Sequence, residues 1–250
     1  MNEKKLVEMS LLAGEIMLAS GAETYRVEDT ITHILKVSGY ETAEGIVTGM
    51  AISVTLADGN ECMISLVKRV KDRATDLGKV YQVNTVSRDF CAGKLSLTEA
   101  YHELKQIQVS KPYGSFQRFL GNVGTVMFFV LLLGGSHYDF AFATVNGLIV
   151  ALCLFGLGKI KLNTFFTNVL CASVVAILSS FFQMNLNMPI SLDVVISGSI
   201  LPLVPGVAIT NAIRDTLQGD YMSGGARAIE AFVMAASIAI GIGVGLTLFK

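Results

Sequence analysis

The chain has 250 residues, of which 52% are hydrophobic and only 16% are charged. This composition excludes an ordinary soluble domain of the same length. The formal net charge is −1 at pH 7, so no strongly basic character favours nucleic acid as a partner.

The charged residues are distributed very unevenly. Residues 1–118 hold 14 basic and 15 acidic residues, whereas residues 119–249 hold only nine charged residues of either sign. We therefore expect an α+β cytoplasmic domain over residues 1–112, followed by an all-α membrane domain over residues 113–250 with about five transmembrane helices. The segment Lys111-Pro112-Tyr113 marks the junction, and the N-terminus lacks the apolar core of a signal peptide.

Two helices are predicted at the start of the chain. Residues 4–19 carry apolar side chains at three- and four-residue spacing and end at Ser20-Gly21. Thr24 is expected to cap a second helix, which stops at Gly39. Together these segments predict a helical hairpin.

A β-hairpin is predicted next, because residues 51–57 and 62–67 alternate on either side of Asp58-Gly59-Asn60. Residues 44–48 are expected to add a third strand. A helix over residues 75–90 follows. The capping-box sequence from Ser96 to Glu99 predicts one more.

The first domain offers few catalytic groups. His33 and His102 are far apart and lack partners at metal-ligand spacing, so we expect surface or packing roles and no metal site. Four cysteines lack the C-x-x-C spacing and are interpreted as free thiols: Cys62, Cys91, Cys153 and Cys171. No cofactor is expected. The group Glu23, Arg26, Glu28 and Asp29 is either an exposed helix start, where carboxylates favour the helix dipole, or part of a site.

Five apolar segments in the second half approach the length that crosses hydrocarbon. They cover residues 119–133, 140–157, 165–182, 194–213 and 226–249. The connections with Lys or Arg, which hold Lys159, Lys161, Arg214 and Arg227, lie on the side of the first domain. This pattern places the N-terminus in the cytoplasm, and only Lys250 dissents.

Polar and small residues interrupt these segments. Asn122, Asn146 and Asn168 either line a solute path or cross-link helices. The small-residue pairs Gly121/Thr125 and Gly241/Gly245 predict close helix packing.

Residues 198–231 combine prolines with ionisable groups at a membrane edge. Pro202 and Pro205 must break a spanning helix, and turns are expected at Gly219-Asp220 and Ser223-Gly224-Gly225. One interpretation is a cytoplasmic loop whose charges only set topology. The other is a site for a solute that carries a carboxylate. Its candidate substrate and coupling residues are Pro202, Pro205, Gly206, Thr210, Asn211, Arg214, Asp215, Asp220, Arg227 and Glu230.

Two separated motifs carry a resemblance to a known family. The first comprises Gly14-Glu15 and the segment from Gly21 to Glu28, and the second comprises Pro205-Gly206, Arg214-Asp215, Gly219-Asp220, Gly224, Arg227 and Glu230-Ala231. In this order they resemble the motifs of the bacterial threonine/serine exporter family over nearly the whole chain. The resemblance implies a cytoplasmic motif at Gly21, Glu23, Arg26 and Glu28, and a membrane motif at Pro205, Arg214, Asp215, Asp220, Arg227 and Glu230.

The chain is similar to the larger subunit of split members of that family, in which a second, smaller membrane protein supplies the remaining spans. Some split relatives are linked to export of a dicarboxylate such as succinate, so threonine, serine and dicarboxylates all stay open as substrates. The expected protein is a non-enzymatic subunit of a secondary exporter in the bacterial inner membrane. Its expected partners are the solute, membrane lipid and the second subunit, and a homo-oligomer stays open.

Two alternatives come from the first domain. It is either a membrane-anchored hydrolase that uses Glu23, Arg26 and Glu28, or a regulatory domain that senses a ligand. The hydrolase alternative lacks a convincing nucleophile or metal in residues 1–118.

Overall fold

The computed structural model of the chain divides into two units, one that holds most of the charged N-terminal half and one that holds most of the apolar C-terminal half. The structure describes residues 2–59, 62–70, 74–110, 113–160, 162–186 and 189–248. One unit comprises Met1–Pro112 together with Val207–Ile229, and the other comprises Tyr113–Gly206 together with Glu230–Lys250. Residues 207–229, which we expected in the membrane domain, thus group with the N-terminal part of the chain.

The first unit is built around α1 (Glu3–Ala19), a helix whose N-terminus is capped by Asn2. The Asn2 side-chain oxygen accepts the backbone N–H of Lys5 at 3.1 Å. The chain then turns through Gly21, whose φ of +86° suits glycine, into α2 (Thr24–Lys36). The predicted helical hairpin is therefore present.

Three antiparallel strands follow in the order β1 (Thr42–Thr48), β2 (Ala51–Asp58) and β3 (Cys62–Arg69). Ile52, Val54 and Leu56 are buried, whereas the side chains between them are partly exposed. One face of the sheet therefore packs on the core, as the alternating sequence predicts. The predicted hairpin is confirmed, although Asn60 in its turn lies outside the described residues.

Two more helices complete the N-terminal portion of this unit, namely α3 (Leu77–Cys91) and α4 (Leu97–Val109). The capping box predicted for α4 is confirmed. The Ser96 N–H donates to Glu99 Oε2 at 2.8 Å, and the Glu99 N–H donates to Ser96 Oγ at 3.3 Å.

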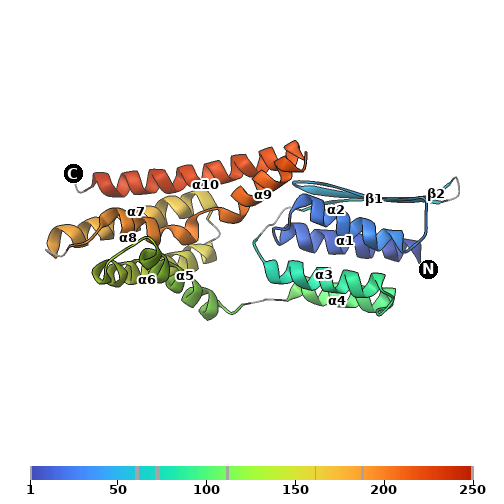
Figure 1. Cartoon of the computed structure of the whole chain (residues 1–250), viewed down its shortest axis with the longest axis horizontal. Coiled ribbons are helices and arrows are strands. Elements are labelled where there is room, and N and C mark those ends of the chain that lie inside the picture. The colour runs from blue at the N-terminus through green and yellow to red at the C-terminus, as the bar shows by residue number, and fades with distance from the viewer. Residues whose placement is uncertain are drawn as a thin grey trace. The chain divides into compact units, whose positions relative to one another are not determined.

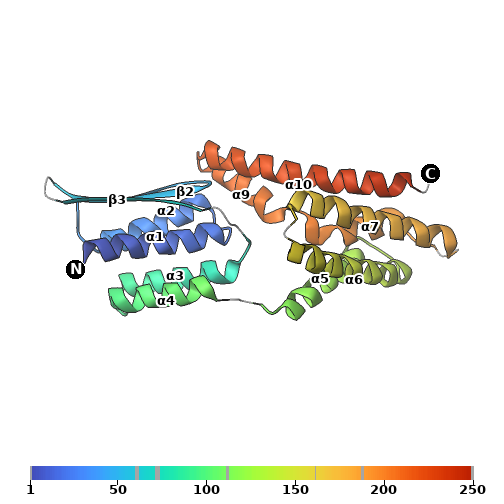
Figure 2. The ribbon, with the colours of Figure 1, turned by 180° about the vertical axis from the view of Figure 1, so that it is seen from behind.

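The first unit is layered. The sheet lies on one side of α1 and α2, and α3 and α4 lie on the other side (Figures 1 and 2). Because α1 is covered from both sides, apolar residues around most of its circumference are buried. The largest fully buried side chains of this core are Leu6, Met9, Met17, Leu18, Ile31, Ile34, Leu35, Ile52, Leu56 and Leu104.

Four helices in the described part of the chain are long and apolar enough to cross a membrane. They are α5 (Ser115–Leu132), α6 (His137–Ile160), α7 (Thr164–Asn185) and α10 (Tyr221–Thr247). A fifth span exists only if a broken pair of helices is counted as one. The expectation of about five membrane-capable helices is met in this form. Lys111-Pro112, Lys161 and Lys250, on which the predicted junction and topology partly rest, lie outside the described residues.

The broken pair consists of α8 (Leu192–Ser199) with the short 3-10 helix η1 (Leu201–Leu203), followed by α9 (Gly206–Leu217). Val204 is extended, with φ −67° and ψ 128°, and Pro205 follows it directly before α9. Proline lacks a backbone donor and clashes with the preceding turn of a helix, so the predicted break occurs where the prolines lie.

The predicted turn at Ser223-Gly224-Gly225 is wrong, because these residues lie inside α10. The helix begins after Asp220, whose Oδ1 accepts the Ser223 N–H at 3.0 Å. A Cβ at Gly224 would lie 2.9 Å from the backbone nitrogen of Thr216 and 3.0 Å from the Ala212 oxygen. This glycine therefore lets α10 pack closely on α9.

Two glycines of α10 let this helix pack closely against a neighbouring helix, whereas a glycine of α5 does not. A Cβ at Gly241 would lie 2.8 Å from Ala172 Cβ, and one at Gly245 would lie 2.6 Å from Ala176 Cβ, so both permit close packing of α10 on α7. Gly121 makes no such packing contact among the described residues, because none of their atoms lies within 4 Å of a Cβ built there. Its carbonyl accepts the hydroxyl of Thr125 at 2.8 Å.

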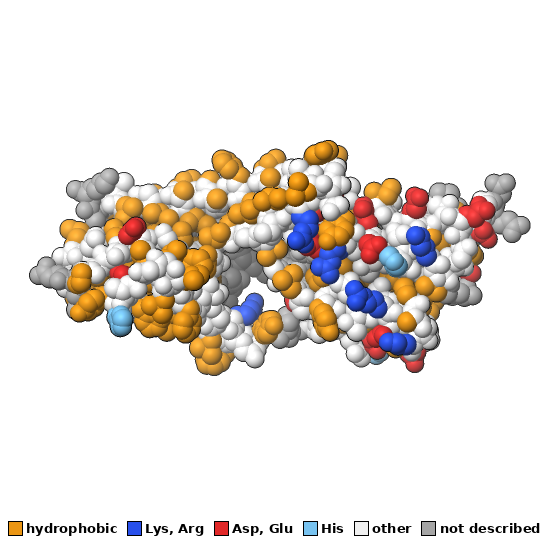
Figure 3. Space-filling view, viewed as in Figure 1, with side chains coloured by type: hydrophobic (Ala, Val, Ile, Leu, Met, Phe, Trp, Pro, Cys, Tyr) orange, Lys and Arg blue, Asp and Glu red, His pale blue; other side chains and the backbone are white. Residues whose placement is uncertain are grey.

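Polar side chains also cross-link helices in the second unit. The Asn146 amide of α6 donates to Ser179 Oγ of α7 at 2.8 Å and to Ser199 Oγ of α8 at 3.2 Å. Asn146 thus serves as a cross-link between helices, one of the two roles considered for it. Elsewhere this unit presents apolar side chains to its surroundings, and Figure 3 shows hydrophobic groups over the visible face of these helices, with few charges.

Candidate functional site

The two sequence motifs meet inside the first unit. Thr24 opens α2, and Asp215 lies on α9, 191 residues further along the chain. The Thr24 N–H donates to Asp215 Oδ1 at 3.2 Å, and the Thr24 hydroxyl donates to Oδ2 at 3.1 Å. Asp215 is 1% exposed. Its carboxylate thus satisfies an N-terminal donor of α2, where negative charge is also favoured by the helix dipole.

This contact corrects the prediction that Thr24 caps α2. The N-cap position is Glu23, whose side chain makes no capping bond, and Thr24 is the first helical residue. The cap is supplied from a distant element instead. Periodicity and local spacing carry no information about such a partner, so sequence reasoning missed the role of Thr24 although the residue lies within the quoted motif.

Arg227 of α10 completes the buried centre of the site. Its Nε lies 3.2 Å from Asp215 Oδ2, and its Nη2 donates to the Ala22 carbonyl at 2.9 Å. The side chains of both ion-pair partners are at least nine-tenths buried. The Nε–H is not aligned for a hydrogen bond despite the ion-pair distance, so charge attraction holds this contact.

A second, more exposed ion-pair group surrounds Glu23. The Glu23 Oε1 atom pairs with Nη1 of Arg214, and Oε2 accepts Nη1 of Arg26 at 3.4 Å. The Glu23 side chain is only 11% exposed, whereas that of Arg214 is 56% exposed. Solvent therefore screens the Arg214 pair much more than the Arg227 pair.

Asn211 connects α9 to the turn before α2. Its amide nitrogen donates to the Gly21 carbonyl at 2.8 Å. Arg227 and Asn211 therefore donate hydrogen bonds to two successive carbonyls of the turn, those of Ala22 and Gly21. Side chains of α9 and α10 thus hold the backbone of the first motif by hydrogen bonds.

Glu28 lies one turn beyond Thr24 and is half-buried. Its Oε1 accepts the backbone N–H of Val47 in β1 at 2.8 Å. Burial raises the pKa of Glu28, the Val47 bond opposes that shift, and the nearby carboxylates of Asp220 and Asp215 raise the pKa further. We call the ionisable residues described so far the charge cluster: Glu23, Arg26, Glu28, Arg214, Asp215, Asp220 and Arg227. Glu28 is an acid of this cluster whose pKa is raised.

Not every predicted residue joins the cluster. Pro202, Pro205 and Gly206 belong to the second unit, as does Glu230, which is exposed. Thr210 is exposed on α9 and donates its hydroxyl to the Val207 carbonyl at 3.0 Å.

Three further ionisable residues of the first unit, Asp29, His33 and His102, lie at the surface. Asp29 pairs with His33 at 3.1 Å, and both side chains are more than half exposed. His102 is also exposed and contacts Gln106 at 2.9 Å. Both histidines have the surface location expected of them.

Chemically, the cluster is a set of balanced and mutually satisfied charges. Glu23 is engaged by two arginines and Glu28 by a backbone amide, which does not favour the hydrolase interpretation. Among the described residues, no group of three or more His, Cys, Asp or Glu side chains is placed to hold a metal ion. The arrangement is suited to locking α9 and the start of α10 onto α2.

Comparisons with known proteins point to one family. The family model described as "Putative threonine/serine exporter" matches residues 8–249. The chain is 21% identical over 252 residues to a "Probable threonine/serine exporter" of Mycobacterium tuberculosis, covering 98% of this chain and 46% of that protein. It is 22% identical over 250 residues to a "Threonine/serine exporter" of Corynebacterium glutamicum, covering 97% of this chain and 51% of that protein. The chain thus spans about half the length of the curated relatives it matches. No solved structure matches it.

Proposed function

Because this chain belongs to the threonine/serine exporter family, we propose that it is a subunit of a secondary exporter in the bacterial inner membrane. Its cargo is a small metabolite that carries a carboxylate. The observation that carries this proposal is the joining of the family's two motifs through Thr24 and Asp215, in a chain that also holds membrane-capable helices.

We propose that a second, smaller membrane protein supplies further spans. The matched relatives are about twice as long as the region they share with this chain. The resemblance to the larger subunits of split exporters supports the same arrangement.

The proposed substrates are threonine, serine or a dicarboxylate such as succinate. The names of the two relatives support the amino acids. The resemblance to split members supports the dicarboxylate. All three solutes carry a carboxylate, the group that an arginine binds with two parallel hydrogen bonds.

We propose that residues 1–112 form a cytoplasmic domain, to which residues 207–229 of the first unit add, and that the rest of the chain after residue 112 forms the membrane domain. The basic residues near the membrane helices support this orientation, because Arg118, Lys159, Arg214 and Arg227 all lie toward connections on the same side as the first unit in the sequence-based topology. The length of α10 supports it as well. Its 27 residues make a helix of about 40 Å, whereas the hydrocarbon core is about 30 Å thick. If α10 crosses close to the membrane normal, one of its ends extends beyond the hydrocarbon, and its first two turns carry Arg227.

The charge cluster is proposed to couple solute movement to an ion gradient. Of the two arginines Arg214 and Arg227, Arg214 is the exposed one. A solute carboxylate can therefore compete with Glu23 for Arg214. Asp215 and Arg227 are buried and hold the hairpin of α9 and α10 in place. Glu28, whose pKa is raised, is proposed to exchange protons, and the helix break at Pro202 and Pro205 is proposed as the hinge.

Transport in proteoliposomes tests this function. The chain is reconstituted with its smaller partner, and efflux of labelled threonine, serine and succinate is measured with and without a proton gradient. We expect gradient-dependent efflux of at least one solute, and a several-fold loss in Arg214→Gln. The control is Arg88→Gln, which removes an exposed arginine of α3. Absence of efflux for all three solutes would overturn the proposal.

A further inference from the structure

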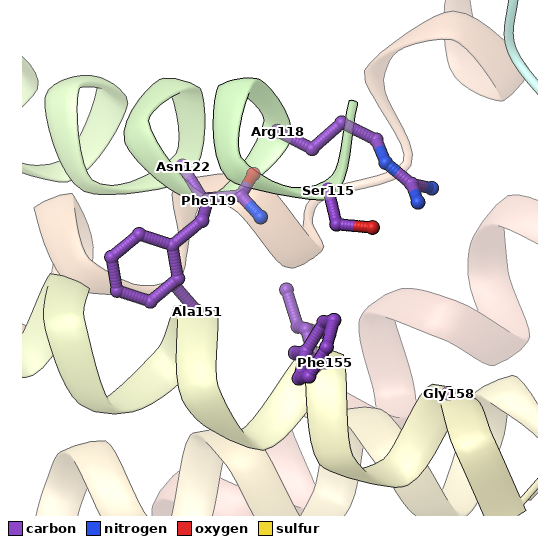
Figure 4. A pocket seen from close by; sticks show the side chains of 8 residues that line it. Ser115, Arg118, Phe119, Asn122, Ala151, Phe155 and Gly158 are labelled. Atoms are coloured by element: carbon purple, nitrogen blue, oxygen red, sulfur yellow. The ribbon is translucent and has the colours of Figure 1, made fainter. Parts of the chain in front are cut away.

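A separate cavity lies between α5 and α6 in the second unit. Its volume is about 530 Å³, within the range of small-molecule sites. Ser115, Arg118, Phe119 and Asn122 line it from α5, and they recur at three- and four-residue spacing on one helix face. Phe155 and Gly158 lie opposite on α6, and Figure 4 shows side chains from both helices facing the same hollow.

Arg118 distinguishes this cavity from the charge cluster. It is the only Lys or Arg side chain that the structure describes in the second unit. Whereas Arg214 and Arg227 each have a carboxylate partner, Arg118 forms no ion pair with any described residue. A guanidinium that already has a partner must break that contact before it binds a solute, whereas the five donors of Arg118 remain available.

The rest of the lining indicates which ligand would fit. The Ser115 hydroxyl and the Asn122 amide add two neutral polar groups on the side of Arg118, and none of the described residues that line the cavity is acidic. Phe119, Leu154 and Phe155 form an apolar wall. One cation with neutral polar neighbours suits a carboxylate, and the apolar wall suits a short carbon chain.

The location of the cavity is consistent with solute entry. The 18 residues of α5 give a helix of about 27 Å, close to the hydrocarbon thickness. Ser115 and Arg118 lie in its first turn, so they fall near one edge of the membrane rather than at its centre. A charged side chain is least costly there.

We propose that the cavity between α5 and α6 is a carboxylate-binding site, with Arg118 as the anion-binding residue and Asn122 and Ser115 as orienting groups. This inference rests on the proposed export function for the identity of its ligand, and it adds a solute site distinct from the charge cluster. The site takes a small aliphatic carboxylate of the size of threonine or succinate.

Equilibrium binding of labelled succinate and labelled L-threonine to the purified full chain tests the charge. We expect Arg118→Gln to weaken binding of at least one of them tenfold or more. Arg88→Gln is the matched control, because it removes the same charge from an exposed position on α3, and it should bind as the unmodified protein does. Equal affinity of Arg118→Gln and Arg88→Gln would overturn the inference.

A matched pair of glycines tests the cavity without removing a charge. Gly156 and Gly158 are both exposed on α6, and neither has an atom within 4 Å of a Cβ built on it, but only Gly158 lines the cavity. Gly158→Leu should therefore reduce binding several-fold, while Gly156→Leu should not. Equal binding by the two leucine variants would count against the site.

Three further outcomes tell a lipid phosphate from a solute carboxylate as the ligand, and separate the proposed site from the proposed export function. Micelles that contain phosphatidylglycerol are tested for protection of the chain against thermal unfolding. If they protect the unmodified chain but not Arg118→Gln, while neither solute binds, the ligand is a lipid headgroup and the solute site is wrong. If Arg118-dependent binding is found without efflux in proteoliposomes, the site stands and the export function fails. If efflux proceeds unchanged in Arg118→Gln, the export function stands and the site fails.

Discussion

The carboxylate of Asp215 accepts both the backbone N–H and the hydroxyl of Thr24, at 3.2 and 3.1 Å. These two bonds join α9 to the first turn of α2 across 191 residues of sequence. The same carboxylate neutralises the buried Arg227. The side chain of Asp215 therefore both caps α2 and neutralises a buried cation.

We expect Asp215→Asn to destabilise the protein strongly, because it leaves the guanidinium of Arg227 buried without a counter-charge. Removing one partner of a buried ion pair costs about 3–5 kcal/mol. Thermal unfolding of the purified full chain in detergent measures the loss. The control is Asp58→Asn, at an exposed aspartate at the end of β2. Equal melting temperatures for the two variants would contradict the assigned role of Asp215.

The two arginines of the second motif should respond differently to the same substitution. Arg227→Gln removes a buried partner of Asp215, so the expected loss is again about 3 kcal/mol or more. Arg214→Gln removes a pair whose arginine is 56% exposed, and solvent-screened pairs contribute less than about 1 kcal/mol. The difference between the two unfolding transitions is the test. A larger effect at Arg214 would reverse the assignment of buried and exposed roles.

Glu28 predicts a pH dependence with a definite sign. Its pKa in the folded protein is raised, mainly by burial. The protonated form is therefore favoured by folding. Its stabilising contribution is fully present below the ordinary pKa of glutamate and is lost as the pH rises through the raised value.

Melting temperature measured from pH 4 to pH 7 checks this sign. Glu28→Gln should remove the decline, because the glutamine oxygen still accepts the Val47 N–H without ionising. Glu99 is the control of opposite sign, since hydrogen bonds from Ser96 lower the pKa of Glu99. Its contribution is present above the ordinary pKa and is lost as the pH falls. Parallel pH profiles for Glu28→Gln and the unmodified protein would rule out the assigned shift.

The approach of α9 and α10 is tested by two adjacent glycines. Gly224→Ala places a methyl group against the Thr216 backbone nitrogen and the Ala212 oxygen, at 2.9 and 3.0 Å, and overpacking of this kind costs about 1–3 kcal/mol. Gly225→Ala meets no atom within 4 Å, so the better helix propensity of alanine should stabilise by up to about 1 kcal/mol. Unfolding of the two variants should therefore shift in opposite directions. A shift of both in the same direction would argue against the close contact at Gly224.

Local patterns predicted the elements well. The alternation over residues 51–57 became β2, the capping box from Ser96 to Glu99 formed as expected, and the break in the helix occurred at the prolines. Each of these features depends on residues that are near one another in sequence. The turn predicted at Ser223-Gly224-Gly225 failed for the complementary reason. Glycines suggest a turn locally, but at Gly224 the missing side chain admits a neighbouring helix.

The sequence alone determined the division into a charged, mixed α/β part and an apolar helical part, because burial and span length follow from composition and periodicity. It also identified Arg214, Asp215 and Arg227 as candidates, since ionisable groups beside apolar segments are costly. Only the tertiary structure decided their partners. Whether an arginine meets a carboxylate, as Arg227 meets Asp215, or remains available in a cavity, as Arg118 does, depends on which distant helix packs beside it. The packing of the whole unit decides which helix that is. A buried charge is stable only beside its counter-charge, and the N-terminal donors of a helix need an acceptor.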